Sequence, residues 1–209
     1  MTVRHVLLLA ALLAPSAAAA AGAIDLRVPH GGGYSVPVTS LKEARFRATV
    51  RQQYDFSCGS AAVATLLTYQ YGVPVDEAEV FRYMYATGDQ ARIRAEGFSL
   101  LDMRRYLASR GFEADGFQVP LDRLLEQGLP AIVLINDGGY RHFVVVRGLR
   151  QGRVLVADPA RGTRAIRRRD FDRIWDSQLL FVVHNRRGLA SFNQARDWDV
   201  APSAPLHTG

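Results

Sequence analysis

The sequence predicts an α+β domain in which N-terminal helices pack on a C-terminal antiparallel sheet. Between residues 58 and 127, apolar side chains recur with helical spacing, and glycines follow the expected helix ends. Between residues 131 and 183, short β-rich runs alternate with glycine turns. Because the helices come first and the strands afterwards, an α+β fold is favoured over an alternating α/β fold.

Four helices are expected in the first half of this domain, at 58–71, 76–86, 100–110 and 120–127. Ser57 stands at the N-cap position of the first helix, and Asp76 opens the second. Ser99 and Asp102 form a capping signature for the third. Glycine follows the first, third and fourth helices, as expected for helix ends.

The expected strands are 131–135, 143–146, 154–156 and 179–183, with a short helical turn at 170–175. Shorter β-like stretches are expected at 34–38 and 46–50. A hairpin centred between Arg150 and Gln151 would place His142 opposite Pro159, and therefore beside Asp158.

The chain begins with features of a secretory signal peptide, assigned to residues 1–23. Arg4 and His5 precede an apolar run of about ten residues, and Ala21-Gly22-Ala23 fits the exit pattern. The run is shorter than the ~20 residues of a membrane span, so a cleaved signal is favoured over a retained anchor. We therefore expect a periplasmic or secreted protein with an arm at 24–45, the folded domain at 46–185 and a polar tail at 186–209. An uncleaved signal would leave the protein associated with the membrane.

The net charge of +6 does not by itself indicate a nucleic-acid partner. Except for Lys42, the basic side chains are arginines scattered along the chain, and they form a run only at residues 167–169. Aromatic residues do not interleave with that run, as they would on a base-stacking surface. Nucleic-acid binding is therefore not expected.

Cys58 is the single cysteine, so it has no disulfide partner within the chain. In an oxidising compartment such a thiol is a core residue, an intermolecular link or a nucleophile. Its place at a predicted helix start favours the thiolate, because the helix dipole stabilises negative charge there. Gly59 leaves room for a substrate backbone, and the Gln52 side-chain amide could serve as an oxyanion donor.

A general base must come from elsewhere in the chain, and His142 is the preferred candidate. The hairpin would bring Asp158 beside it, so that the carboxylate fixes the imidazole tautomer and leaves one nitrogen for the thiol. His184 has no acidic residue at a comparable pairing position. Each residue alone has an ordinary structural explanation, and a cysteine at a helix start is often just a small buried hydrophobe. Their joint occurrence favours catalysis.

These residues resemble the C39 peptidases, papain-like cysteine peptidases best known as N-terminal domains of bacteriocin-exporting transporters. The resemblance covers about residues 46–185. The pieces that carry it are Gln52-x5-Cys58-Gly59-x-Ala61, Tyr69-x-Tyr71-Gly72, His142-Phe143-Val144-Val145-Val146 and Val154-Leu155-Val156-Ala157-Asp158-Pro159-Ala160.

The resemblance implies a papain-like fold, with Cys58 as nucleophile, His142 as base and acid, Asp158 as orienting residue and Gln52 as oxyanion donor. Gly59 and Tyr140 are assigned to substrate binding. Neither a cofactor nor a metal is expected. Relatives cut leader peptides after two glycines, in a groove that rejects side chains at those positions. The implied substrate is therefore a peptide or protein segment with glycine or other small residues.

Departures from the transporter-fused pattern indicate a stand-alone, exported branch of the family. Ser57 stands where fused members usually have aspartate, and the chain has no P-loop pattern. The signal peptide would place the domain outside the cytoplasmic membrane. A component of a secretion or surface-fibre system is thus a candidate substrate.

Other hypotheses remain open at this point. A catalytically degenerate C39-like domain would bind a peptide or secretion-system partner without cutting it. Cys58 could instead link two copies of the chain, or form a metal site with His142 and Asp158, although zinc sites usually offer local ligand pairs. A glycine run at residues 31–33 could be a self-cleavage site, an arm that occupies the substrate groove, or ordinary linker.

Overall fold

A computed structural model describes residues 23–27, 33–37 and 40–199, which fall into two units, Met1–Ser40 and Leu41–Gly209. The described part of the first unit is an antiparallel hairpin of β1 (Ala23–Arg27) and β2 (Gly33–Pro37). The β-like stretch predicted at 34–38 is confirmed as far as residue 37. The expected signal peptide lies outside the described residues except for its last position, Ala23. Most of the glycine run at 31–33 also lies outside them.

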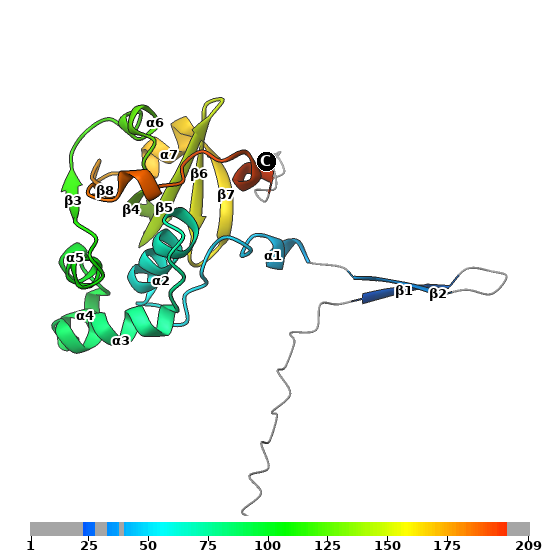
Figure 1. Cartoon of the computed structure of the whole chain (residues 1–209), viewed down its shortest axis with the longest axis horizontal. Helices are drawn as coiled ribbons and strands as arrows, with labels where there is room; N and C mark the ends of the chain where they lie inside the picture. The colour runs from blue at the N-terminus through cyan, green and yellow to red at the C-terminus, as the bar shows by residue number, and fades with distance from the viewer. Residues whose placement is uncertain (1–22, 28–32, 38–39, 200–209) are drawn as a thin grey trace, which may run out of the picture. The chain divides into compact units, whose positions relative to one another are not determined.

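The second unit contains the folded domain (Figure 1). Its helices are α1 (Leu41–Ala44), α2 (Cys58–Thr65), α3 (Glu77–Thr87), α4 (Gln90–Glu96), α5 (Leu100–Ser109), α6 (Arg123–Gln127), α7 (Arg168–Ile174) and α8 (Ala195–Asp199). A π-helical turn, η1 (Leu66–Gln70), extends α2, and a 3₁₀ turn, η2 (Arg187–Leu189), precedes α8. The four predicted helices are therefore confirmed as α2 with η1, α3, α5 and α6.

The helix starts agree with the predicted caps in two cases and differ in one. The Ser99 side chain accepts from the backbone of Asp102 and the Asp102 side chain from that of Ser99, which completes a capping box for α5. Asp76 accepts from a backbone N–H of α3. Ser57 occupies the N-cap position of α2, but its hydroxyl bonds with the backbone of Tyr54 instead of the helix. Ser57 is therefore not a side-chain cap.

The strands of the second unit form one antiparallel sheet in the order β3-β8-β4-β5-β6-β7. Their bounds are β3 (Ala114–Phe117), β4 (Ala131–Asp137), β5 (Tyr140–Arg150), β6 (Arg153–Asp158), β7 (Gly162–Arg167) and β8 (Leu180–Val183). Four of them were predicted. The edge strands β3 and β7 were missed, because their mixed polar sequences lack a β-rich run.

Two further expectations need correction. The stretch 46–50 is not a strand but a series of hydrogen-bonded turns, such as the one from Thr49 N to Phe46 O. Helix α4 was not predicted, because Ile93 is its only buried residue and gives no apolar periodicity. Asp89 caps this helix by accepting from two backbone N–H groups.

The β5–β6 hairpin has a different register from the predicted one. Gln151 and Gly152 both have positive φ and form a two-residue turn, so that Arg150 pairs with Arg153. A bulge between Val146 and Gly148 then shifts the pairing by one residue. The predicted pairing of His142 with Pro159 was therefore wrong, although His142 and Asp158 still meet.

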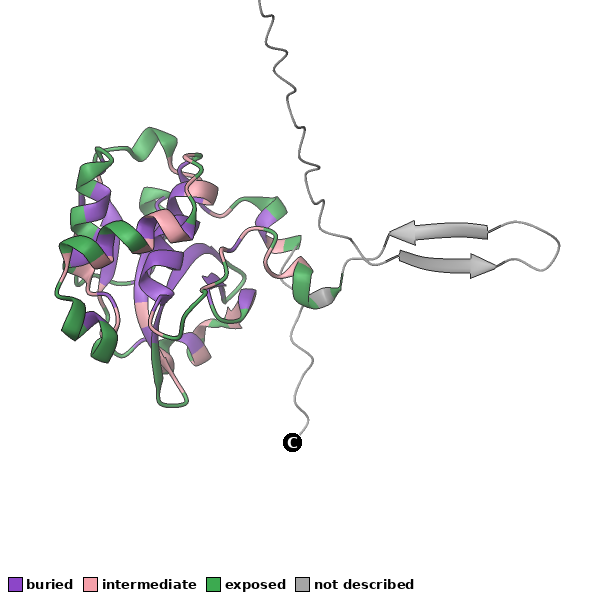
Figure 2. Ribbon diagram, turned by 90° about the horizontal axis from the view of Figure 1, so that it is seen from below, coloured by how far each residue is buried: buried purple, intermediate pink, exposed green. Residues whose placement is uncertain are grey.

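Helices cover both faces of the sheet. The core on one face joins α2, η1, α3 and α5 to strand residues such as Val145 and Ala157. The core on the other face joins α6 and α7 to Val144 and Val156. Strand β5 is consequently buried from His142 to Leu149 without the usual alternation. Figure 2 shows the buried residues gathered in the sheet and in the helix that packs against it.

Candidate active site

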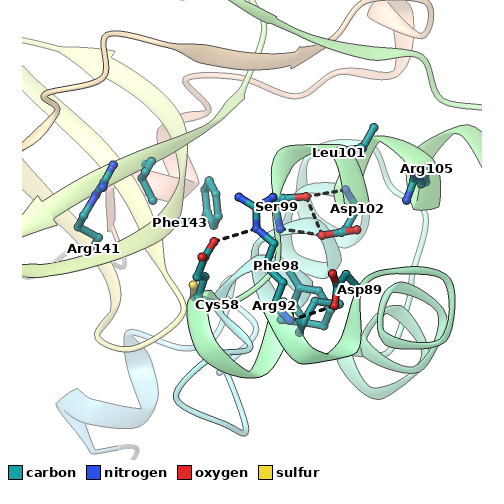
Figure 3. A pocket seen from close by; sticks show the side chains of 14 residues that line it. Cys58, Asp89, Arg92, Phe98, Ser99, Leu101, Asp102, Arg105, Arg141 and Phe143 are labelled. Atoms are coloured by element: carbon teal, nitrogen blue, oxygen red, sulfur yellow. Dashed lines mark hydrogen bonds and ion pairs between the residues drawn. The ribbon is translucent and has the colours of Figure 1, made fainter.

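A cleft of about 560 Å³ opens between the helices and strands β4 and β5 (Figure 3). Arg141 and Phe143 line it from β5, whereas Phe98 and Ser99 lie on the opposite side, just before α5. Cys58, the first residue of α2, lies between these two walls. The single thiol of the chain therefore borders the cleft.

The Cys58 thiol is mostly enclosed, since the residue is 8% exposed and every residue of α2 is buried. This burial raises the pKa of the thiol, because the thiolate loses solvation. Hydrogen bonds from the backbone N–H groups of Phe143 and Gly59 lower the pKa but do not outweigh burial. The resting thiol is thus protonated at neutral pH and requires a base before it can attack a carbonyl.

His142 and Asp158 form the pair that the sequence predicts. Nε2 of His142 lies 3.1 Å from Oδ2 of Asp158, and both side chains are fully buried. The contact uses one ring nitrogen and leaves Nδ1, which is 3.5 Å from the carbonyl oxygen of Tyr140. Phe143, the neighbour of His142, lines the same cleft as Cys58. Strand β5, which carries the imidazole, packs against α2, which carries the thiol.

The Asp158 carboxylate is well supplied with donors. Burial raises the pKa of Asp158, but the hydrogen bond and charge of His142 together with the Arg164 guanidinium more than offset it, so that the pKa falls below its usual value. Arg164 lies 3.0 Å from Oδ2, and the backbone N–H groups of Ala160 and Arg161 donate to Oδ1. Asp158 therefore remains ionised at neutral pH.

Sequence reasoning missed Arg164. It lies on β7, opposite Val156 of β6, and it also pairs with Asp137 at the end of β4. Nothing local distinguishes it from the many other arginines of the chain. Recognition of β7 as the neighbour of β6 is the signal that would have identified it.

Gln52 lies beside the same pair of residues. Its backbone N–H donates to the carbonyl of Pro159, the residue after Asp158. Its side-chain Nε2 donates to the carbonyl of Tyr54 and to the hydroxyl of Tyr140, at 3.2 and 3.4 Å. The structure thus joins Gln52, Tyr140 and the His–Asp pair in one contact network.

The structure gives Gly59 a packing function that the sequence did not suggest. A β-carbon at this position would lie 2.8 Å from Cε of Met103 and 2.9 Å from Cβ of Phe98. Close packing between α2 and the start of α5 is therefore a structural reason for a glycine at this position. A substrate contact at Gly59 stays a prediction.

A second histidine–carboxylate pair corrects another expectation. Nε2 of His184 lies 2.9 Å from Oδ2 of Asp115, although no acidic partner was expected for this histidine. Asp115 belongs to β3, the strand that was not predicted. This pair is partly exposed and lies outside the residues that line the Cys58 cleft. It is therefore a useful internal control for the buried pair.

Known proteins resemble this chain in sequence and in fold. A sequence profile described as the Peptidase C39 family matches residues 47–187. The probable functional amyloid protease FapD of Pseudomonas fluorescens is 40% identical over 156 residues, which are 75% of this chain and 69% of the relative. FapD of Pseudomonas aeruginosa matches equally well.

The chain belongs to the peptidase C39 family. Its fold resembles the peptidase domain of Streptococcus ComA, with a TM-score of 0.54 and 21% identity over 65% of this chain and 97% of that domain. It also resembles a double-glycine-motif protease of an AMS/PCAT transporter, solved with a leader peptide, with a TM-score of 0.53 and 25% identity over 65% and 91% of the two chains.

These likenesses confirm the predicted α+β, papain-like fold and identify this C39 protein as a cysteine peptidase. Within the part of the chain that the structure describes, no helix is long and apolar enough to span a bilayer.

Proposed function

We propose that this C39 peptidase is an exported endopeptidase that cleaves glycine-containing segments through Cys58, His142 and Asp158. The observation that carries the proposal is the fully buried His142–Asp158 pair next to the cleft that Cys58 borders. A buried pair of this kind fixes the imidazole ring and its tautomer, which general-base catalysis requires. Gln52 is proposed as the oxyanion donor.

The proposed reaction is acyl transfer. As Sγ of Cys58 attacks the substrate carbonyl carbon, its proton passes to Nδ1 of His142, and the carbonyl oxygen takes the electron pair and becomes an oxyanion. The Gln52 amide donates to this oxygen. Collapse breaks the C–N bond, and Nδ1 returns its proton to the leaving amine. Water then attacks the thioester with His142 as base, which releases the carboxylate and restores the thiol.

The ionised Asp158 supports this sequence of proton transfers. When Nδ1 takes the thiol proton, the ring becomes a cation inside a buried site. Asp158 accepts from Nε2 and offsets that charge, while Arg164 keeps the carboxylate itself from becoming protonated. This arrangement compensates for the raised pKa of the thiol, because the thiolate needs to form only during attack.

The substrate and location belong to the same proposal. We propose a glycine-rich or double-glycine segment in a component of a secretion or surface-fibre system. Support comes from the double-glycine-motif protease among the structural relatives and from the functional amyloid protease among the sequence relatives. The signal-like residues 1–23 support a periplasmic or secreted site of action.

A peptide-library assay tests the proposal. The purified protein is incubated with peptides that contain paired glycines and with matched peptides in which alanine or leucine replaces each glycine, and products are identified by mass spectrometry. We expect cleavage after paired glycines and none by a Cys58→Ala protein with an unchanged melting temperature. Equal cleavage by the Cys58→Ala protein would exclude the mechanism, and a protein that binds the peptides without cutting them would be the degenerate binding domain.

A further inference from the structure

Tyr140 contacts both the proposed base and the proposed oxyanion donor. Its ring stacks on the His142 ring, with centroids 4.7 Å apart and an interplanar angle of 26°. Its hydroxyl accepts from Nε2 of Gln52 and donates to the carbonyl of Asp55 at 3.3 Å. Among the described aromatic rings, that of Tyr140 is the one that stacks on His142, so its side chain contacts both groups.

The hydrogen bonds of Gln52 occupy both donors of its NH₂ group in this state. A glutamine NH₂ group has two N–H donors, and here one is directed to Tyr54 O and the other to the Tyr140 hydroxyl. The amide oxygen of Gln52 is buried and has no hydrogen-bond partner. The side-chain amide is therefore held in place by its two donor hydrogen bonds. A substrate oxyanion needs one of them.

We propose that Tyr140 is a positioning residue whose hydroxyl occupies, in the resting enzyme, the acceptor position at Gln52 that the substrate oxygen takes during catalysis. Its ring at the same time holds His142 against Asp158. The inference rests on the proposed function, because the hydroxyl acts through Gln52 as oxyanion donor and the ring acts through His142 as general base.

The contacts of Tyr140 allow the Gln52 amide to exchange this hydroxyl for a substrate oxygen while the tyrosine ring stays against His142. Both of its hydrogen bonds are long, and the residue is 41% exposed, whereas His142 is fully buried. Gly138 and Gly139 precede it in the β4–β5 turn with φ values of +66° and +88°. Such long, solvent-exposed bonds are weak, so a carbonyl oxygen that carries developing charge is a better acceptor for Gln52.

A reversible aldehyde inhibitor tests the role of the hydroxyl. The probe is N-acetylglycylglycinal, whose carbonyl carbon forms a hemithioacetal with the thiol and places an oxygen at the oxyanion position. We expect the Tyr140→Phe protein to bind it about twofold to tenfold more tightly than wild type, the effect of one lost competing hydrogen bond. In a Gln52→Ala background the same substitution should have no effect.

Iodoacetamide provides the control, because its displacement reaction at the thiol develops no carbonyl oxyanion. Its rate should be the same for wild type and the Tyr140→Phe protein. Unchanged or weaker aldehyde binding in the Tyr140→Phe protein would overturn the inference. So would an equal gain in the Gln52→Ala background, which would show that the hydroxyl acts through packing.

The ring is tested separately by Tyr140→Leu, for which we expect kcat to fall about twofold to tenfold relative to Tyr140→Phe, the size of a lost aromatic contact. Equal kcat values would remove the role of the ring. A Cys58→Ala protein separates this inference from the proposed function. If wild type and Cys58→Ala bind the aldehyde alike, the covalent mechanism itself fails. If only wild type does, failure of the Tyr140 variants leaves the proposed function intact.

Discussion

Asp158 holds His142 through a 3.1 Å contact between Oδ2 and Nε2, and neither side chain is exposed to solvent. The two residues come from neighbouring strands, β5 and β6, and they meet despite a bulge and a turn that shift the expected register. The contact leaves Nδ1 as the ring nitrogen that the proposed reaction assigns to the thiol proton. Five further properties of the molecule, besides those tested above, lead to measurable expectations.

The two histidine–carboxylate pairs predict opposite responses to alanine substitution. We expect His142→Ala to lower kcat/KM by at least about 10²-fold, since it removes the general base. His184→Ala, which disrupts only the partly exposed pair with Asp115, should leave kcat/KM within about twofold. Initial rates on one glycine-containing peptide provide the comparison. A large loss in the His184→Ala protein together with a small loss in the His142→Ala protein would reverse the assignment.

Adjacent glutamines provide a matched test of the oxyanion donor. Gln52→Ala should lower kcat by about 10²- to 10³-fold with little change in KM, because its amide acts on charge that develops in the transition state. Gln53 is exposed and should tolerate the same substitution. Steady-state kinetics of both proteins decide the point. A Gln52→Ala protein with wild-type kcat would require another donor for the oxyanion.

The buried thiol predicts slow alkylation at neutral pH. Because burial raises the pKa of Cys58, the thiolate fraction and the alkylation rate should both rise with pH, with a midpoint above the value of about 8.5 for an ordinary thiol. Iodoacetamide rates between pH 6 and 10 measure this, and Cys58 is the single cysteine that can react. N-acetylcysteine serves as the reference. A midpoint near pH 6 would indicate a preformed thiolate–imidazolium pair instead.

Because the pKa of Asp158 is lowered in the folded protein, we expect its contribution to stability to be lost in acid. Its folded-state pKa lies below the unfolded value of about 3.9, so its contribution to stability is present above that value. The contribution is lost as the pH falls through the folded-state pKa. Urea unfolding midpoints should therefore show that Asp158→Asn destabilises the protein at pH 7 and that the difference shrinks below about pH 4. A difference that grows in acid would contradict the lowered pKa.

A buried ion pair attaches the C-terminal segment to the sheet. Arg147, which is 1% exposed, lies 2.8 Å from Asp197 of α8 and donates to the carbonyl of Ala48. Asp197→Ala would leave the guanidinium buried without its carboxylate, and we expect a loss of about 3–5 kcal/mol in the free energy of unfolding.

Glu126→Ala is the control for that experiment, because its pair with Arg123 is more than half exposed and should contribute less than about 1 kcal/mol. Denaturant titrations of both proteins compare the two pairs. Equal and small losses would show that the C-terminal segment contributes little to the stability of the domain.

The sequence alone determined the main helices, the central strands and the identity of the proposed catalytic residues. Apolar periodicity located α2, α3 and α5, and β-rich runs located β4, β5 and β6, because each pattern is contained within one segment. Cys58 could be singled out because the chain has one cysteine and it stands at a helix start. These properties depend on residues that are close together in the sequence, so they can be recognised without knowledge of the tertiary contacts.

Tertiary structure decided the features that depend on neighbours distant in sequence. Arg164 beside Asp158, Asp115 beside His184 and the Tyr140 contact with Gln52 all join segments whose own sequences give no sign of the partner. The pKa of the thiol was likewise decided by the fold. A helix start favours the thiolate, but enclosure by packed neighbours has the larger effect, and it arises only when the helices close over the sheet.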